Sequence, residues 1–139
     1  MQSEVNISNT LRYGTNKNRV LIVDDEADLT LLYRLSLELA GFKVETYNDS
    51  SEALSNFRPG SYDVIILDIK MPVMDGFSLY EELKKKDSNA KICFLTAGEM
   101  YHQQYRLDKY DSLEGNLFLR KPISSEDLIK EITAFITGD

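Results

Sequence analysis

The chain has 139 residues, of which 42% are hydrophobic and 28% charged, as expected for one globular domain with a single core. Its formal net charge of −7 opposes binding to nucleic-acid phosphates, and no apolar run approaches the ~20 residues that span a bilayer. The N-terminus shows no apolar segment typical of an export signal. The single cysteine, Cys93, excludes an internal disulfide and fits a reducing compartment. We therefore expect a cytoplasmic protein with no membrane partner and no direct nucleic-acid partner.

The chain begins with a polar segment that has no hydrophobic period. Residues 1–18 are rich in Asn, Ser and Thr, so we expect a flexible N-terminal arm followed by one folded domain over 19–139. The first predicted strand covers 19–23 and has the continuous apolar character of a strand buried on both faces. It ends directly at Asp24 and Asp25.

The next elements follow from periodicity and capping signals. Leucines recur at helical spacing from about 27 to 40, and Gly41 is a suitable residue to end a helix. These leucines are Leu31, Leu32, Leu35 and Leu39. Residues 43–47 alternate like a strand whose polar positions suggest the sheet edge. Several N-cap candidates at 48–51 predict a short helix that ends before Pro59-Gly60.

The stretch from 63 to 72 places a carboxylate at the end of a buried strand. Four consecutive apolar residues at 64–67 predict this strand, and Asp68 follows them. Pro72 cannot continue a central strand, and Asp75-Gly76 marks a turn. The sheet is therefore expected to end just after Asp68.

The second half of the chain continues the alternation of strands and helices. A helix is predicted from about 76 to 86, then a strand over 91–95 that ends at Thr96, and a shorter strand over 117–119 that ends at Lys121. The last helix has a serine N-cap followed by an apolar stripe. These residues are Ser124 and then Leu128, Ile129, Ile132, Phe135 and Ile136.

This alternation predicts an α/β fold with a doubly wound parallel sheet and helices on both faces. Ligands bind such sheets outside the carboxyl ends of the strands. Three acids (Asp24, Asp25 and Asp68), the hydroxyl of Thr96 and the ammonium of Lys121 are expected to meet there. Taken singly, Thr96 could be a strand-end cap and Lys121 a surface lysine. Together the five suit phosphoryl transfer to an Asp nucleophile beside Mg²⁺, because that metal prefers oxygen ligands.

Four motifs in order resemble the receiver domain of two-component response regulators, the family that includes the chemotaxis regulator. They are Val-Asp-Asp-Glu at 23–26, Leu-Asp-Ile-Lys-Met-Pro-Val-Met-Asp-Gly at 67–76, Leu-Thr-Ala at 95–97 and Phe-Leu-Arg-Lys-Pro at 118–122. The resemblance covers 19–137. It implies a flavodoxin-like sheet of five strands in the order 2-1-3-4-5.

The resemblance also implies the roles of the acidic residues. Asp68 would be the phosphoacceptor, phosphorylated by a histidine kinase or a histidine phosphotransfer protein. Mg²⁺ would be held by Asp24, Asp25, Asp68 and the backbone carbonyl of Lys70. The domain would catalyse only its own phosphorylation and dephosphorylation. Lys70 stands two residues after the phosphoacceptor, where it is expected to slow loss of the phosphoryl group.

The remaining motifs correspond to the family's switch. The resemblance implies that Thr96 hydrogen-bonds the phosphoryl group, that Lys121 pairs with it, and that Phe118 is the switch aromatic. It implies a cis bond between Lys121 and Pro122. The signal would pass through the face of helix four, strand five and helix five to an unknown downstream protein, or to a second copy in a phosphorylation-dependent homodimer.

One segment departs from the family pattern. Residues 98–116 lack the usual small-residue turn, so the family's fourth helix is expected to be short or irregular. This keeps open a phosphorylation-independent receiver-like interaction module. A haloacid-dehalogenase-type phosphatase fits less well, because Lys70 stands where that family has a second Asp. The chain ends soon after the last helix, which suits a single-domain regulator or a receiver excised from a longer protein.

Overall fold

The computed structural model describes residues 18–97 and 116–138. The expected arm (1–18) and the irregular segment (98–116) lie outside the described residues, except for the last residue of each. Within those residues the sheet consists of β1 (Arg19–Val23), β2 (Lys43–Tyr47), β3 (Val64–Asp68), β4 (Ile92–Thr96) and β5 (Leu117–Arg120). The helices are α2 (Ala27–Leu39), α3 (Ser50–Ser55), α4 (Gly76–Lys86) and α6 (Ser125–Thr137).

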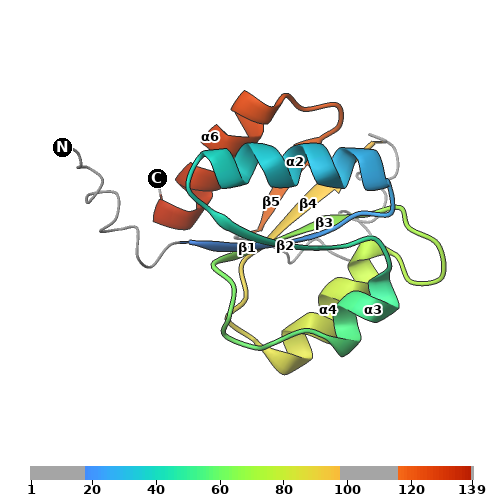
Figure 1. Cartoon of the computed structure of the whole chain (residues 1–139). Helices are drawn as coiled ribbons and strands as arrows, with labels where there is room; N and C mark the ends of the chain where they lie inside the picture. Colours follow the sequence, from blue (N-terminus) through green and yellow to red (C-terminus); the bar gives the residue numbers. More distant parts are fainter. Residues whose placement is uncertain (1–17, 98–115, 139) are drawn as a thin grey trace.

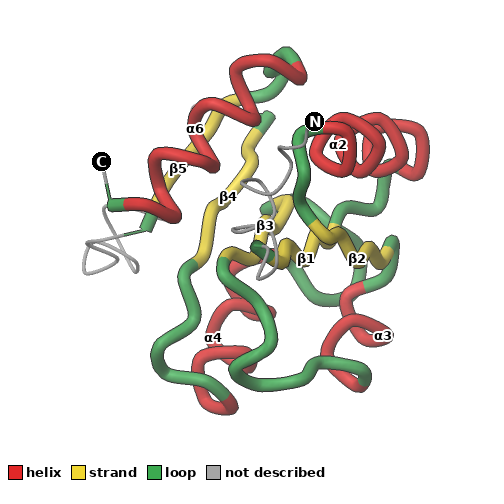
Figure 2. The backbone as a smooth tube through the Cα atoms, turned by 60° about the vertical axis from the view of Figure 1, so that its left-hand side comes forward, coloured by secondary structure: helices red, strands yellow, loops and turns green. Residues whose placement is uncertain are grey.

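All five strands are parallel and lie in the order β2-β1-β3-β4-β5. Helices α2 and α6 cover one face of the sheet, and α3 and α4 cover the other (Figure 1). Figure 2 shows the strands side by side between these two layers. The predicted doubly wound fold, its strand order and the edge position of β2 are therefore confirmed. Among the described helices, none is both long and apolar enough to cross a membrane.

The sheet is buried on both faces because its central strands are apolar at nearly every position. Alternate residues point to opposite sides of a strand, so each strand contributes to two separate cores. Leu21, Ile65 and Phe94 pack toward α3 and α4. Ile22 and Ile66 pack with the buried Cys93 toward α2 and α6.

Helix α2 has the predicted extent but buries a different face from its leucine-rich one. Thr30, Tyr33 and Leu37 are its buried residues. The leucines at positions 31, 32, 35 and 39 are 49–90% exposed. The predicted glycine end is confirmed, because Gly41 follows the last turn with φ of 102°. The spacing of the leucines therefore indicated a helix correctly without identifying its inward side.

The loop between β3 and α4 ends where the backbone at Gly76 lies close to the backbone at the end of β3. Asp75 caps α4 by accepting a hydrogen bond from Ser78 N at 2.8 Å. Gly76 follows as the first helical residue, and its N–H donates to the Ile69 carbonyl at 2.7 Å. A Cβ on Gly76 would clash with the Asp68 carbonyl oxygen and with Ile69. This glycine lets the chain turn back against the end of β3.

Candidate functional site

Strand register brings the predicted polar residues to one edge of the sheet. Val23 lies opposite Leu67, so the next residues, Asp24 and Asp68, are neighbours. On the other side of β3, Asp68 lies opposite Leu95, the residue before Thr96. The strands therefore deliver both carboxylates and the threonine hydroxyl to the same place.

Lys121 completes the cluster from β5. Its backbone N–H donates to the Thr96 carbonyl at 2.8 Å, which fixes the turn after the strand. Its ammonium lies 2.9 Å from Asp24 Oδ2 and 3.3 Å from Asp68 Oδ1. These side chains are almost fully buried, with 9% of Lys121, none of Asp24 and 6% of Asp68 exposed. The bond between Lys121 and Pro122 is cis, as the resemblance implied.

Burial and like charge oppose ionisation at the centre of this cluster. Burial, followed by repulsion from Asp24, raises the pKa of Asp68 to about 7, although Lys121 acts in the opposite direction. Burial also raises the pKa of Asp24, against the hydrogen bond from Glu26 N and the attraction of Lys121. The pKa of Lys121 is raised as well: burial lowers it, but Glu26 and Asp24 outweigh that effect. The single lysine does not fully compensate the carboxylates.

The acidic part of the site fits a divalent cation. Each of Asp24, Asp25 and Asp68 offers an oxygen, and these oxygens lie within 4.8 Å of one another. The buried Asp24 Oδ2, although close to Lys121, makes no hydrogen bond within the described residues. A hard cation such as Mg²⁺ would satisfy this oxygen and relieve the repulsion between the acids.

The cluster opens into a hollow of about 460 Å³. Asp25, Lys70 and Ala97 are among its lining residues, together with Asp68 and Lys121. The hollow gives a reacting group a path to the end of β3. Of these lining residues, Lys70 is exposed to solvent.

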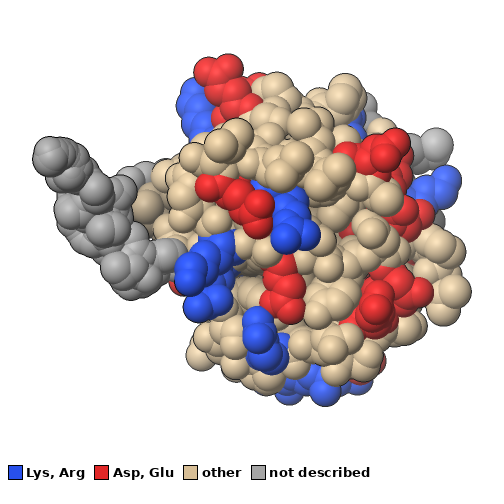
Figure 3. All heavy atoms as spheres, in the orientation of Figure 1, with Lys and Arg blue, Asp and Glu red and all other residues tan. Residues whose placement is uncertain are grey.

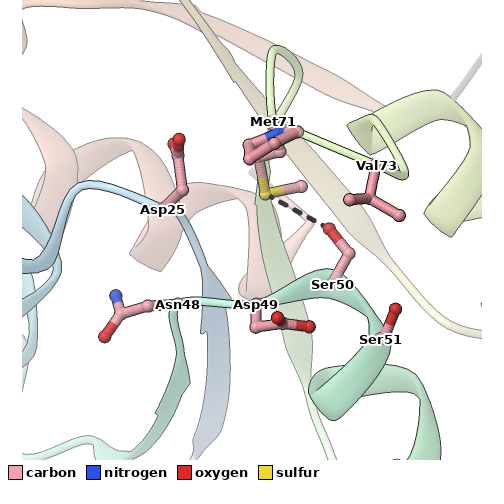
Figure 4. A pocket seen from close by; sticks show the side chains of 8 residues that line it. Asp25, Asn48, Asp49, Ser50, Ser51, Met71 and Val73 are labelled. Carbon is pink, nitrogen blue, oxygen red and sulfur yellow. Dashed lines mark hydrogen bonds between the residues drawn. The ribbon is translucent and has the colours of Figure 1, made fainter.

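A smaller pocket of about 80 Å³ lies beside the site (Figure 4). Asp25 borders it on one side, and the loop after β3 borders it on another. The Ser50 hydroxyl contacts the Met71 sulfur at 3.6 Å and donates to the Met74 carbonyl at 2.8 Å, which ties this loop to α3. Val73 lies in the loop with φ of 69° and a side chain that is 99% exposed.

The two predicted switch residues lie at different depths. Thr96 is 4% exposed at the end of β4. Phe118 on β5 is partly buried and stacks on Phe94 with ring centroids 5.1 Å apart. Thr96 ends β4 and Phe118 lies in the neighbouring β5, so both belong to strands whose ends border the site.

Sequence reasoning did not single out three residues that position the acidic loop. The side chains of Asn48 and Thr30 donate to the Asp24 carbonyl at 2.7 and 3.1 Å. Glu26 pairs with Lys121 at 2.8 Å. The position of Glu26 directly after Asp25 was the only indication in the sequence that it would lie near the site. Nothing in the local sequence indicated that Asn48 or Thr30 would reach this loop.

Charged side chains are unevenly distributed over the visible surface. On the face shown in Figure 3, acidic side chains predominate on the right, where α2 begins after the end of β1 in Figure 1. Basic side chains are interspersed with acids elsewhere on this face. On this face, the end of the molecule that carries the site is therefore mainly acidic.

Comparisons with known proteins support this assignment of the fold. A family model described as the response regulator receiver domain matches residues 20–133. The transcriptional regulatory protein PrrA of Mycobacterium leprae (strain TN) is 34% identical over 125 residues, which cover 88% of this chain but 52% of PrrA. This chain therefore spans about half the length of that relative.

Solved structures give the same result for the fold. A response regulator receiver domain protein from Clostridium thermocellum has a TM-score of 0.75 and 30% identity, covering 87% of this chain and 95% of its own. The response regulator TrrA from Thermotoga maritima, solved in complex with Mg²⁺-BeF, has a TM-score of 0.72 and 32% identity. That match covers 85% of this chain and 98% of TrrA.

Proposed function

The chain belongs to the response regulator receiver family, a family of signalling modules, and we propose that it is a phosphoacceptor. Asp68 accepts a phosphoryl group from the phosphohistidine of a histidine kinase or a histidine phosphotransfer protein. An Asp68 oxygen forms the new bond to phosphorus while the bond to the imidazole nitrogen breaks, giving an aspartyl phosphate and a free histidine. The observation that carries this proposal is the position of Asp68 at a hollow beside two acids and Lys121.

Each neighbouring residue has a role in this proposal. Asp24, Asp25, Asp68 and the Lys70 carbonyl would hold Mg²⁺, which supplies positive charge to the transferring group when bound. Lys121 attracts the phosphoryl oxygens that form on Asp68. It also keeps the buried Asp24 charge paired throughout the reaction.

The signal is proposed to leave through β5. The Thr96 hydroxyl moves toward the new phosphoryl group, which adds about 1.5 to 2 negative charges and three acceptor oxygens. Phe118 then turns inward, and the surface formed by the family's fourth helix, β5 and α6 changes. A downstream protein, or a second copy of the chain, reads that surface.

The wider setting is also a proposal. We assign 1–18 to an arm and 19–139 to the receiver domain, acting in the cytoplasm. The curated relative PrrA is a transcriptional regulatory protein about twice as long as the matched region. A DNA-binding output would therefore belong to a full-length protein of that kind, because the net charge of −7 on this chain opposes a direct nucleic-acid role.

Intact mass after incubation with acetyl phosphate tests the proposal. We expect the gain of one phosphoryl group, dependent on Mg²⁺ and abolished by Asp68→Asn. Asp28→Asn is a matched control, because Asp28 is an exposed acid in the first turn of α2. A folded wild-type protein that binds Mg²⁺ but gains no mass would instead favour the phosphorylation-independent interaction module.

A further inference from the structure

The ammonium of Lys121 has a third carboxylate partner. Glu26 Oε1 accepts a hydrogen bond from Lys121 Nζ at 2.8 Å, the shortest of its contacts with Asp24, Glu26 and Asp68. The Glu26 side chain is 60% exposed, whereas that of Asp24 is fully buried. Glu26 is therefore the partner that Lys121 can lose most easily, because a released Glu26 carboxylate is solvated by water.

Glu26 does not serve as an ordinary helix cap. It occupies the N-cap position of α2, where Ser, Thr, Asp or Asn is preferred because a short side chain bonds the first free N–H groups. The Glu26 side chain makes no such cap bond. Its backbone is nevertheless fixed, since its N–H donates to Asp24 Oδ1 at 2.9 Å and its carbonyl accepts from Thr30 N at 3.0 Å. The carboxylate is thus directed toward Lys121 from a rigid backbone.

A phosphoryl group on Asp68 would compete with Glu26 for the same ammonium. Lys121 already contacts Asp68 Oδ1 at 3.3 Å, so the new oxygens would form within its reach. Two anions that both touch one ammonium lie within about 6 Å of each other, where like charges repel. The Asp24 carboxylate is fully buried, so water cannot replace Lys121 there, whereas water can solvate the 60% exposed Glu26 carboxylate. The exchange is therefore expected at Glu26.

We infer that Glu26 is a positioning residue that holds Lys121 in the unphosphorylated protein and releases it when Asp68 is phosphorylated. Glu26 thereby opposes formation of the phosphorylated state. This inference rests on the proposed function. It states that Glu26 shifts the equilibrium between the unphosphorylated and the phosphorylated protein toward the unphosphorylated one.

Binding of fluoroberyllate, a phosphoryl mimic, tests the inference in the full chain at saturating Mg²⁺. We expect Glu26→Gln, which removes the charge but keeps the shape, to bind fluoroberyllate about two- to fivefold more tightly than wild type, as measured by ¹⁹F NMR titration. The gain should disappear in a Lys121→Met background, because the competition requires the ammonium. Thermal unfolding and Mg²⁺ affinity, measured without fluoroberyllate, show whether the variant has altered the fold or the metal site instead.

Asp28→Asn is the control for charge alone, since Asp28 lies two residues further on and is exposed. Equal tightening by Asp28→Asn and Glu26→Gln would overturn the inference, as would unchanged or weaker binding by Glu26→Gln. Persistence of the effect without Lys121 would also overturn it. In each of these cases the wild-type protein still binds fluoroberyllate, so the proposed function would stand. Failure of the wild-type protein both to bind fluoroberyllate and to be phosphorylated would overturn the proposed function, and this inference with it.

Discussion

The Asp68 carboxyl group is buried in a position where its negative charge is unfavourable. Its side chain is 6% exposed, and burial together with Asp24 raises its pKa to about 7 from an ordinary value of 3.8. Below the ordinary value, the carboxyl is protonated in both the folded and the unfolded state. As pH rises toward 7, the unfolded chain loses this proton first, so the folded state loses stability.

The raised pKa of Asp68 therefore predicts that Asp68→Asn stabilises the folded protein, and that this stabilisation depends on pH. In metal-free protein at pH 8, the neutral amide should raise the free energy of unfolding by about 1–3 kcal/mol, because it removes a buried charge. The difference should shrink toward zero near pH 4, where wild-type Asp68 is already protonated. Urea unfolding in EDTA at both pH values measures the difference. A variant less stable than wild type at pH 8 would show that Lys121 fully compensates Asp68.

We expect Lys70 to affect the lifetime of the proposed phosphoryl group. It lines the open hollow together with Asp68, so its side chain can obstruct or orient the attacking water. We expect Lys70→Ala to lose the phosphoryl group about threefold faster, a modest effect for one exposed cation. Intact mass followed over time measures the decay, with Lys43→Ala as a control at the opposite end of the sheet. Decay at the wild-type rate or more slowly would contradict this role.

Val73 stores backbone strain beside the site. A β-branched residue at φ of 69° is unfavourable, and a side chain that is 99% exposed recovers little of that energy by packing. Val73→Gly should therefore raise the free energy of unfolding by about 0.5–1 kcal/mol. Val73→Ala, which keeps a Cβ, should gain less. Thermal unfolding of the pair decides, and a glycine variant less stable than the alanine variant would argue against strain.

Within helix α2, leucines that follow the same helical spacing differ in burial. Leu37 is fully buried, whereas Leu35 in the same helix is 51% exposed. Leu37→Ala should lower the free energy of unfolding by about 2–5 kcal/mol, because it leaves a cavity. Leu35→Ala should change it by less than about 1 kcal/mol. Chemical denaturation of both variants checks the difference. Similar losses would mean that the leucine-rich face is covered in solution.

The elements could be predicted to within a few residues because each has a local signal. Asp49 caps α3 through Glu52 N, and Ser124 caps α6 through Asp127 N, as the capping patterns indicated. The inward face of α2 could not be predicted in this way. A helix with leucines on one side and Thr30, Tyr33 and Leu37 on the other has two plausible apolar faces, and only packing against α6 and the sheet selects one.

The meeting of the site's polar residues at one sheet edge could be predicted because they stand at strand ends. Parallel pairing converts those positions into neighbours, as the register between β1, β3 and β4 shows. Side-chain partners were harder to predict. The Asn48 side chain crosses from the loop after β2 to the Asp24 carbonyl, and Glu26 turns back to Lys121 across 95 positions. Such contacts depend on loop geometry, which has no periodicity in the sequence.

Across the whole molecule, one sheet carries both the candidate site and the proposed output surface. The acidic loop follows β1, Asp68 ends β3, and Lys121 follows β5. These strands share a core with Phe94 and Phe118. A charge change at Asp68 therefore acts on the sheet that also supports the proposed output surface, without requiring a second domain to complete the site.

Chemical mapping of the modified residue would show directly whether Asp68 is the phosphoacceptor. After reaction with acetyl phosphate and Mg²⁺, borohydride reduces an aspartyl phosphate to homoserine, and peptide mass spectrometry then locates the converted residue. We expect conversion at Asp68 and at no other acid. Conversion at Asp24, at Asp25 or at a surface acid, or no conversion at all, would contradict it.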